Sequence, residues 1–508
     1  MSVDTASASG RRPSIYAGTN FAFLGLIATL AAIGGSDNPR LLYLLALFAI
    51  CTTPILLVKR LNGPYAALTV CLSVILFSYG ISDVIGLLGV RGLTLSEGIL
   101  SDSEFAILLG VGLLVFGYRM ALIGFNDGTG NLPARNSDWP EGTAILIGLF
   151  CWLVGVIATW FWQTNLEFRL DMATGAPSIW TTMATVLANY LHPLGLAILA
   201  YRFVRRRGPW MTLLIVIVLG SEFILGFVED SKELAVRGLA IVVLTGLLVE
   251  GSVPRTWLLT AAIVAALSFP IFQGYRYVLH ESGESRLQAA SNLIENIEKA
   301  IDESKHSSNN EPLVSATGRL SFISRTSLKP TMEMIVGMTG HSVKYQDGHT
   351  IELFFAGMVP RAFWRDKPDT SVGQLFNRQY HAAEDPDTYI SPTFLGELYW
   401  NYGWTGILLG MPVIGFLLGF ANRLSSMSES RSLTRYLALT VTIYLICLRF
   451  EGGIALQFLQ WFRSIVIVLV LHLIFARRSS PPAVMNTMHA ETLAPAYAQA
   501  RTFPNLMR

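Results

Sequence analysis

The residue types with the clearest chemical potential lie in two short stretches between residues 359 and 403. Residues 359–368 read Val-Pro-Arg-Ala-Phe-Trp-Arg-Asp-Lys-Pro, the densest mixture of basic and aromatic side chains in the chain. Residues 391–403 place one carboxylate, Glu397, among aromatic and small residues and lead directly into an apolar run. Arginine forks suit phosphate oxygens, so the first stretch favours a phosphate contact at a membrane surface. The alternative is an interfacial anchor, with Trp364 among headgroups and Arg361 on phospholipid.

Both stretches contain spaced patterns. Pro360, Arg361, Trp364, Lys367 and Pro368 form Pro-Arg-x-x-Trp-x-x-Lys-Pro, and Gly396, Glu397, Tyr399, Asn401 and Gly403 form Gly-Glu-x-Tyr-x-Asn-x-Gly. Upstream, Arg319 opens the sequence Arg-Leu-Ser-Phe. This combination resembles the oligosaccharide repeat-unit polymerases, the Wzy-type enzymes of bacterial polysaccharide assembly. The chain departs from one pattern of that family, because Gly373 lies one residue too far from Arg361 for the arginine–glycine spacing of some members.

The resemblance implies a reaction and a role for each residue. Wzy-type enzymes transfer a growing glycan from undecaprenyl diphosphate onto the next lipid-linked repeat unit, on the outer face of the bacterial inner membrane. Catalysis then falls to Arg361 and Glu397. Binding of the lipid-linked oligosaccharide falls to Arg319, Trp364, Arg365, Lys367, Tyr399, Trp400 and Asn401. The resemblance also implies membrane lipids, a chain-length regulator and a flippase of the same pathway as partners.

The chemistry of these side chains is compatible with that reaction. Arginine and lysine supply fixed positive charge for a departing diphosphate, and aromatic rings stack on sugar faces. A carboxylate, Glu397 or Glu352, suits the role of base toward an acceptor hydroxyl. The other interpretation of Glu397 is a cap on a helix that begins near Tyr402, where a carboxylate suits the helix dipole.

Metal ions and cofactors are not expected. The three histidines of the outer segment, His341, His349 and His381, are scattered, and no cluster of His, Asp and Glu has the spacing of metal ligands. The sequence therefore predicts a metal-independent transfer without a cofactor.

The composition indicates a chain that largely faces lipid. Of the 508 residues, 52% are hydrophobic and only 14% are charged, whereas a soluble domain carries about 25% charged residues. A net charge of +2 is too small to indicate a nucleic-acid partner. The four cysteines all lie in apolar stretches, so no disulfide framework is expected.

The apolar runs predict an all-α membrane protein with about twelve spans, since a helix needs about 20 residues to cross the hydrocarbon core. The predicted spans are 20–35, 40–58, 64–90, 104–125, 142–162, 178–201, 210–228, 237–250, 255–272, 402–420, 433–448 and 453–476. Arginine and lysine gather in alternate loops, which places both termini in the cytoplasm by the positive-inside rule.

Five regions follow from this topology. They are a disordered tail at 1–19, nine spans in 20–272, a mostly helical outer segment at 273–401 between spans nine and ten, three spans in 402–476, and a disordered tail at 477–508. Within the outer segment we expect an amphipathic helix at 284–304, a turn at Gln346-Asp347-Gly348, and an apolar stretch, 351–358, at the membrane interface.

Four ionisable residues, Asp83, His192, Glu222 and Arg463, fall well inside predicted spans. A charge in that position costs about 2.5–3.5 kcal/mol on insertion scales, so it usually faces a partner or a polar cavity. Two interpretations remain at this point. The residues line a cavity that opens outward, or Glu222 and Arg463 form a structural pair.

Two other functions share the predicted topology. A ligase would move the finished glycan from the same lipid to another acceptor. A twelve-span secondary transporter usually has two similar halves. This chain instead has nine predicted spans, then a long outer segment and then three spans, which argues against a transporter.

Overall fold

The computed structural model describes most of the helical part of the chain. The described ranges are 39–56, 63–87, 100–123, 137–164, 179–229, 231–251, 327–359, 372–383, 388–425, 432–475 and 477–478, with scattered residues at 256–261, 263–264, 271–272, 275, 292, 295–299 and 364. The predicted first span, both predicted tails except 477–478, part of the ninth span, and most of helix 284–304 lie outside these residues.

The described chain is helical apart from one pair of two-residue strands, which confirms the predicted all-α class. Six helices are long and apolar enough to cross a membrane: Asp102–Ile123, Glu141–Phe161, Met183–Arg205, Pro209–Phe227, Phe394–Leu424 and Ile454–Phe475. Three shorter apolar helices are Leu41–Thr53, Ala66–Ile81 and Leu433–Leu448. The helices therefore indicate a membrane protein, while the predicted count of twelve spans is not confirmed by the described residues.

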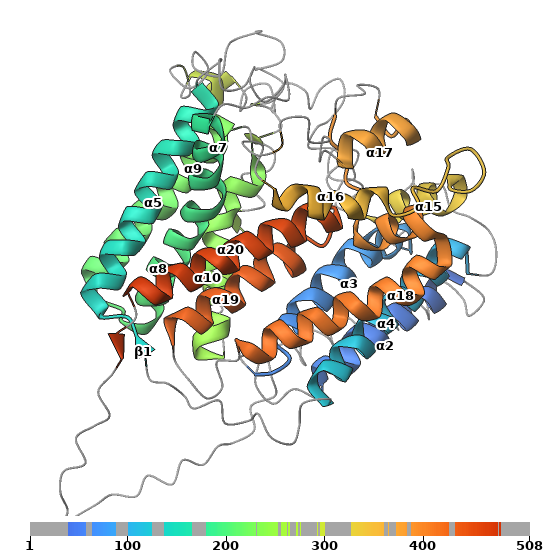
Figure 1. Cartoon of the computed structure of the whole chain (residues 1–508), viewed down its shortest axis with the longest axis horizontal. Coiled ribbons are helices and arrows are strands. Elements are labelled where there is room, and N and C mark those ends of the chain that lie inside the picture. The colour runs from blue at the N-terminus through green and yellow to red at the C-terminus, as the bar shows by residue number, and fades with distance from the viewer. Residues whose placement is uncertain are drawn as a thin grey trace, which may run out of the picture.

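The helices form two groups with a pair between them (Figure 1). The α4–α18 group contains α2 (Pro39–Leu56), α3 (Ala66–Leu87), α4 (Asp102–Ile123) and α18 (Phe394–Leu424). The α8–α10 group contains α5 (Glu141–Thr164), α7 (Ile179–Val186), η1 (Leu187–Leu191), α8 (His192–Arg205), α9 (Pro209–Glu229) and α10 (Lys232–Glu250). Between the groups lie α19 (Leu433–Thr442), continued by η2 (Ile443–Leu448), and α20 (Ile454–Phe475).

The two ends of this bundle differ. Three short helices, α15 (Lys329–Met338), α16 (His349–Met358) and α17 (Val372–Tyr380), lie across one end (Figure 1). At the other end, β1 (Ser137–Asp138) pairs antiparallel with β2 (Arg477–Arg478). The segments before α5 and after α20, which the sequence assigns to one side of the membrane, therefore meet at one end of the bundle.

Glycines allow the closest helix contact, between α4 and α18. A Cβ atom on Gly117 would lie 2.0 Å from the carbonyl oxygen of Pro412, and one on Gly415 would lie 2.1 Å from that of Leu114. Only glycine lets two helix backbones approach so closely. The two helices therefore touch through their main chains along this seam.

Helix α18 bends at the point where the sequence predicts its start. Tyr402 and Gly403 leave the helical conformation, and the φ of +59° at Gly403 favours glycine. The helix begins at Phe394, eight residues before the predicted start, because Thr393 accepts the N–H of Gly396 at 3.0 Å as its N-cap. The first arm of α18 carries the Gly-Glu-x-Tyr-x-Asn pattern.

Candidate functional site

Glu397 lies in the first turn of α18 with its side chain fully buried. Its Oε2 accepts the backbone N–H of Ile454 at 2.6 Å, and Ile454 is the first residue of α20. The carboxylate therefore caps a helix, as one interpretation of the sequence held, but the helix is α20 and not one that begins near Tyr402. A carboxylate at this position also suits the positive end of the α20 dipole.

The second oxygen of Glu397, Oε1, is also buried, and the Thr350 hydroxyl is the other described donor to this carboxylate. Gly453 lies against the carboxylate, since a Cβ atom added there would be 3.2 Å from Oε2 and 3.8 Å from Cβ of Val372 on α17. Glu397 is thus enclosed by α17 and the turn before α20, with the Ile454 N–H and the Thr350 hydroxyl as its described donors.

Asn401 holds the start of α16 against α18. Its Oδ1 accepts the N–H of Gly348 at 3.0 Å, and its Nδ2 donates to the Thr350 hydroxyl at 2.6 Å and to the Glu397 carbonyl at 2.7 Å. Gly348, with φ of +92°, completes the turn that the sequence predicts at 346–348. Both amide N–H groups of Asn401 are therefore hydrogen-bonded inside the protein, and one of them bonds the main-chain carbonyl of Glu397.

The predicted sugar-stacking aromatics differ in exposure. Trp400 is fully buried, and its ring packs edge-on against Phe376 and Tyr380 of α17, with centroids 5.5 and 5.7 Å away. Tyr399 is also buried and packs edge-on against Trp404 at 5.6 Å. Trp364 is 42% exposed. In this structure Trp400 joins α17 to α18 and has no free ring face, whereas Trp364 has one.

The predicted cations Arg319, Arg361, Arg365 and Lys367 lie outside the described residues. The described chain reaches the basic stretch through Val359, directly after α16. Helix α16 packs on α20, and the carbonyl of Gly357 accepts a hydrogen bond from Arg463 at 2.5 Å. Phe355 on α16 is 66% exposed. An exposed apolar side chain beside a candidate span agrees with the predicted interfacial position of residues 351–358.

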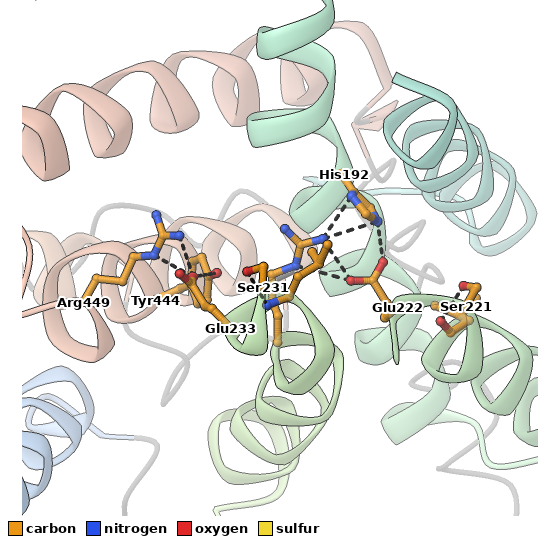
Figure 2. A network of polar contacts seen from close by, with 10 residues as sticks. His192, Ser221, Glu222, Ser231, Glu233, Tyr444 and Arg449 are labelled. Atoms are coloured by element: carbon orange, nitrogen blue, oxygen red, sulfur yellow. Dashed lines mark hydrogen bonds and ion pairs between the residues drawn. The ribbon is translucent and has the colours of Figure 1, made fainter. Parts of the chain in front are cut away.

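A buried polar network in the α8–α10 group was not anticipated (Figure 2). Glu222 bonds His192 Nε2 through Oε1 and Arg237 Nη2 through Oε2, the latter at 2.9 Å. Arg237 Nη2 also lies 2.9 Å from His192 Nδ1. The geometry fits a neutral imidazole that donates from Nε2 and accepts at Nδ1.

The predicted pair of Glu222 with Arg463 is therefore wrong. The predicted span 237–250 put Arg237 at its first position, but α10 begins at Lys232 and carries Arg237 into the bundle. One signal could have shown this. Ser231 is an N-cap that accepts the N–H of Leu234 at 3.3 Å, and serine before a helical run is readable in sequence.

A second network joins α10 to the end of η2 (Figure 2). Glu233 Oε1 accepts from Arg449 Nε at 2.7 Å and from the Tyr444 hydroxyl at 2.6 Å. Arg449 also donates to Gln460 at 3.1 Å. This network ties the turn between η2 and α20, the turn that covers Glu397, to α10.

A third cluster fixes α15 to the α4–α18 group. Lys329 Nζ lies 2.8 Å from both oxygens of Asp83 and 2.6 Å from Glu104 Oε1, and all three side chains are almost fully buried. Asp83, predicted to lie inside a span near its outer end, thus takes its partner from the outer segment. The cluster places α15 over α3 and α4.

Among the described residues, no group of three or more His, Cys, Asp or Glu side chains could hold a metal ion. No family model, curated protein or solved structure matches the chain, so the site rests on its own geometry.

Proposed function

We propose that this protein polymerises undecaprenyl-diphosphate-linked oligosaccharide repeat units by glycosyl transfer at the end of the bundle that α15–α17 cover. The supporting observation is the environment of Glu397. A fully buried carboxylate, held by the Ile454 N–H and the Thr350 hydroxyl with no described cation beside it, lies in the Gly-Glu-x-Tyr-x-Asn-x-Gly pattern, the same pattern on which the resemblance to Wzy-type enzymes depends. Glutamate is almost never fully buried without a charge partner, and such carboxylates often have a functional reason.

In the proposed reaction, Glu397 accepts the proton of an acceptor hydroxyl as that oxygen attacks the anomeric carbon of the donor glycan. The bond between this carbon and the diphosphate oxygen breaks, and the diphosphate leaves with the electron pair. Arg361, Arg365 and Lys367 then stabilise the departing charge, with Arg319 as a further cation. Because Glu397 lies beneath Val372 of α17, the acceptor reaches it when α17 and the turn before α20 separate.

The exposed apolar side chain of α16 supports the same assignment. This helix carries an exposed phenylalanine and contacts a candidate span, as the proposed position at the membrane interface requires. A lipid-linked donor keeps its diphosphate at the interface because the polyprenyl chain is buried in the bilayer. In this proposal, the basic stretch that follows α16 in the sequence binds the leaving group there.

The test compares two carboxylates. Glu397→Gln keeps an oxygen that can accept the Ile454 N–H, so the protein should fold, while loss of the base should lower polymer formation by about 10²–10⁴-fold. Glu352→Gln tests the other candidate base, which is exposed on α16, and should leave polymer formation unchanged. Purified protein in lipid nanodiscs would receive lipid-linked repeat units, and chain length would be read on gels, with and without excess EDTA.

If the Glu397→Gln protein formed polymer of normal amount and chain length, Glu397 would only cap α20 and would not be the base. Activity that disappears in EDTA and returns with magnesium would contradict the metal-independent transfer. In cells, deletion of the gene should leave single lipid-linked repeat units, whereas accumulation of full-length polymer would indicate a ligase instead.

A further inference from the structure

Tyr389 presents a partly exposed aromatic ring at the end of the bundle that α15–α17 cover. The residue is 45% exposed. A Cβ atom added to Gly373 of α17 would lie 2.6 Å from Cε1, Cε2 and Cζ of this ring alike. A point at equal distances from these three atoms lies over the centre of the ring, so one face of Tyr389 rests on the glycine. The exposed surface of the ring is therefore its other face and its edge.

The segment that carries Tyr389 is held in place on both sides. The N–H of Ile390 donates to the Gly373 carbonyl at 3.3 Å, which fixes the backbone beside the ring to α17. Further on, Thr393 has a φ of +66°, which residues with a side chain rarely adopt, and its hydroxyl accepts the Tyr79 hydroxyl at 3.1 Å. Strained backbone of this kind clusters at functional sites. The ring is thus pre-organised, so a ligand that stacks on it orders few protein groups.

Tyr389 lies beside the segments that enclose Glu397. Val372, the residue before the glycine under the ring, lies 3.8 Å from a Cβ atom added to Gly453, and that atom would lie 3.2 Å from the Glu397 carboxylate. Burial, followed by the charge of Glu397, raises the pKa of the Tyr389 hydroxyl to about 12. The ring is therefore close enough to the proposed base for the charge of that base to act on the phenol.

The chemistry of this position suits a sugar ring. Tyrosine combines an apolar ring face with a polar hydroxyl, and a pyranose has the matching features, an apolar face of C–H groups and hydroxyls at its edge. A phosphate would need an available cation. Arg449, the cation whose charge acts on Tyr389, is already bonded to Glu233 and Gln460. The position therefore favours a neutral ligand with an apolar face over an anion.

We propose that Tyr389 is a platform on which a pyranose ring stacks, over α17 and beside Glu397. Identification of that pyranose as part of the acceptor glycan rests on the proposed function. The platform holds the acceptor at α17, the segment that must move before an acceptor hydroxyl reaches Glu397. Tyr389 is then a substrate-binding residue, in addition to those that the sequence pattern indicates.

The test is saturation-transfer difference NMR on the purified full-length protein in lipid nanodiscs, which detects weak binding without turnover. The probes are the methyl glycosides of glucose, galactose and N-acetylglucosamine, with mannitol as a polyol that has no ring. We expect at least one glycoside to receive saturation mainly at the C–H protons of one ring face, and mannitol to receive none. Tyr389→Ala should weaken binding of that glycoside about three- to tenfold, as for a lost stacked pair, whereas Tyr389→Phe should retain it.

Two further variants separate the ring from its support. Gly373→Ala places a methyl group where the ring now lies, so it should weaken glycoside binding although the tyrosine is still present. Tyr345→Ala is the matched control, because it removes another partly exposed tyrosine of the same outer layer, and binding should not change. Thermal unfolding would confirm that each variant is folded. With lipid-linked repeat units as substrate, Tyr389→Ala should raise the KM for the acceptor more than it lowers kcat.

Three results would overturn the platform. They are no saturation of any glycoside, saturation of mannitol equal to that of the glycosides, and unchanged glycoside binding by Tyr389→Ala, which would make the ring an interfacial anchor. The two proposals fail separately. Glycoside binding that depends on Tyr389 in a protein that forms no polymer contradicts the proposed function alone. Polymer formation by Tyr389→Ala with an unchanged KM for the acceptor contradicts the platform alone.

Discussion

The α4–α18 group and the α8–α10 group both pack through glycines, but they differ in the regularity of their helices. In the first, backbones touch through Gly117 and Gly415. In the second, a Cβ atom on Gly195 would lie 2.3 Å from the backbone nitrogen of Trp152, so these helices also touch through their main chains. The second group, together with η2 beside it, contains the two π segments η1 and η2. Segments of this kind are rare and often occur at functional sites.

The buried charges differ in the same way. Lys329 pairs with two carboxylates, Asp83 and Glu104, and so holds α15 against α3 and α4. In the α8–α10 group, His192, Glu222 and Arg237 bond one another inside the bundle. The first cluster holds two distant regions of the chain together, and the second joins the consecutive helices α8, α9 and α10.

The largest effect is expected from Lys329→Met, which leaves Asp83 and Glu104 buried without their cation. Removing one partner of a buried ion pair costs about 3–5 kcal/mol, so the free energy of unfolding in detergent should fall by about that amount. Lys344→Met, at an exposed lysine, is the control. Adding Asp83→Asn and Glu104→Gln to Lys329→Met should recover most of the loss. A change below about 1 kcal/mol would show that α15 does not depend on this cluster.

Gly117→Ala should have the next largest effect. The new Cβ atom would meet the Pro412 carbonyl oxygen at 2.0 Å, and a backbone atom in a packed helix cannot move aside easily. Overpacking of this kind costs about 1–3 kcal/mol. Gly112→Ala, in the same helix with nothing within 4 Å, should instead gain up to about 1 kcal/mol from helix propensity. Equal thermal stability of the two variants would contradict a backbone contact between α4 and α18.

The helical class could be predicted from the sequence because an apolar run of membrane length has few other structures available. The contact of Asn401 with Glu397 was also accessible, since residues four apart share one face of a helix. Hydropathy could not place Arg237 inside a helix. A hydropathy window ends a span at the first charged residue, whereas α10 begins at its N-cap, Ser231, further upstream. Nor could hydropathy pair Lys329 with Asp83, 246 residues apart, because such a pairing depends on how the helices pack and not on local pattern.

The prediction of the site was partial for a related reason. The pattern from Gly396 to Gly403 identified the first arm of α18 up to its bend. The spacing of residues in a pattern does not show which of their side chains are buried. Trp400 and Asn401 are of the types that bind sugars, yet here they fix α17 and α16 to α18. Arg463 was predicted as a partner of Glu222, whereas the fold pairs Glu222 with Arg237, and Arg463 donates to the Tyr190 hydroxyl and the Gly357 carbonyl.

The smallest effect separates two threonine hydroxyls that both face the Tyr436 hydroxyl. Thr245 donates to the Ile241 carbonyl at 2.6 Å and lies 2.6 Å from the Tyr436 hydroxyl. Thr245→Val should therefore lower the free energy of unfolding by about 1–2 kcal/mol, because it also leaves the Tyr436 hydroxyl with one partner fewer.

Thr440 contacts the same Tyr436 hydroxyl more weakly than Thr245 does, since only the Thr245 contact meets a short hydrogen-bond distance. Thr440→Val should therefore lower the free energy of unfolding by less than about 1 kcal/mol. Denaturant unfolding of both variants in one detergent gives the difference directly. If Thr440→Val destabilised the protein as much as Thr245→Val, the two threonines would hold Tyr436 equally, and α19 would depend on its own hydroxyl as much as on the one that α10 supplies.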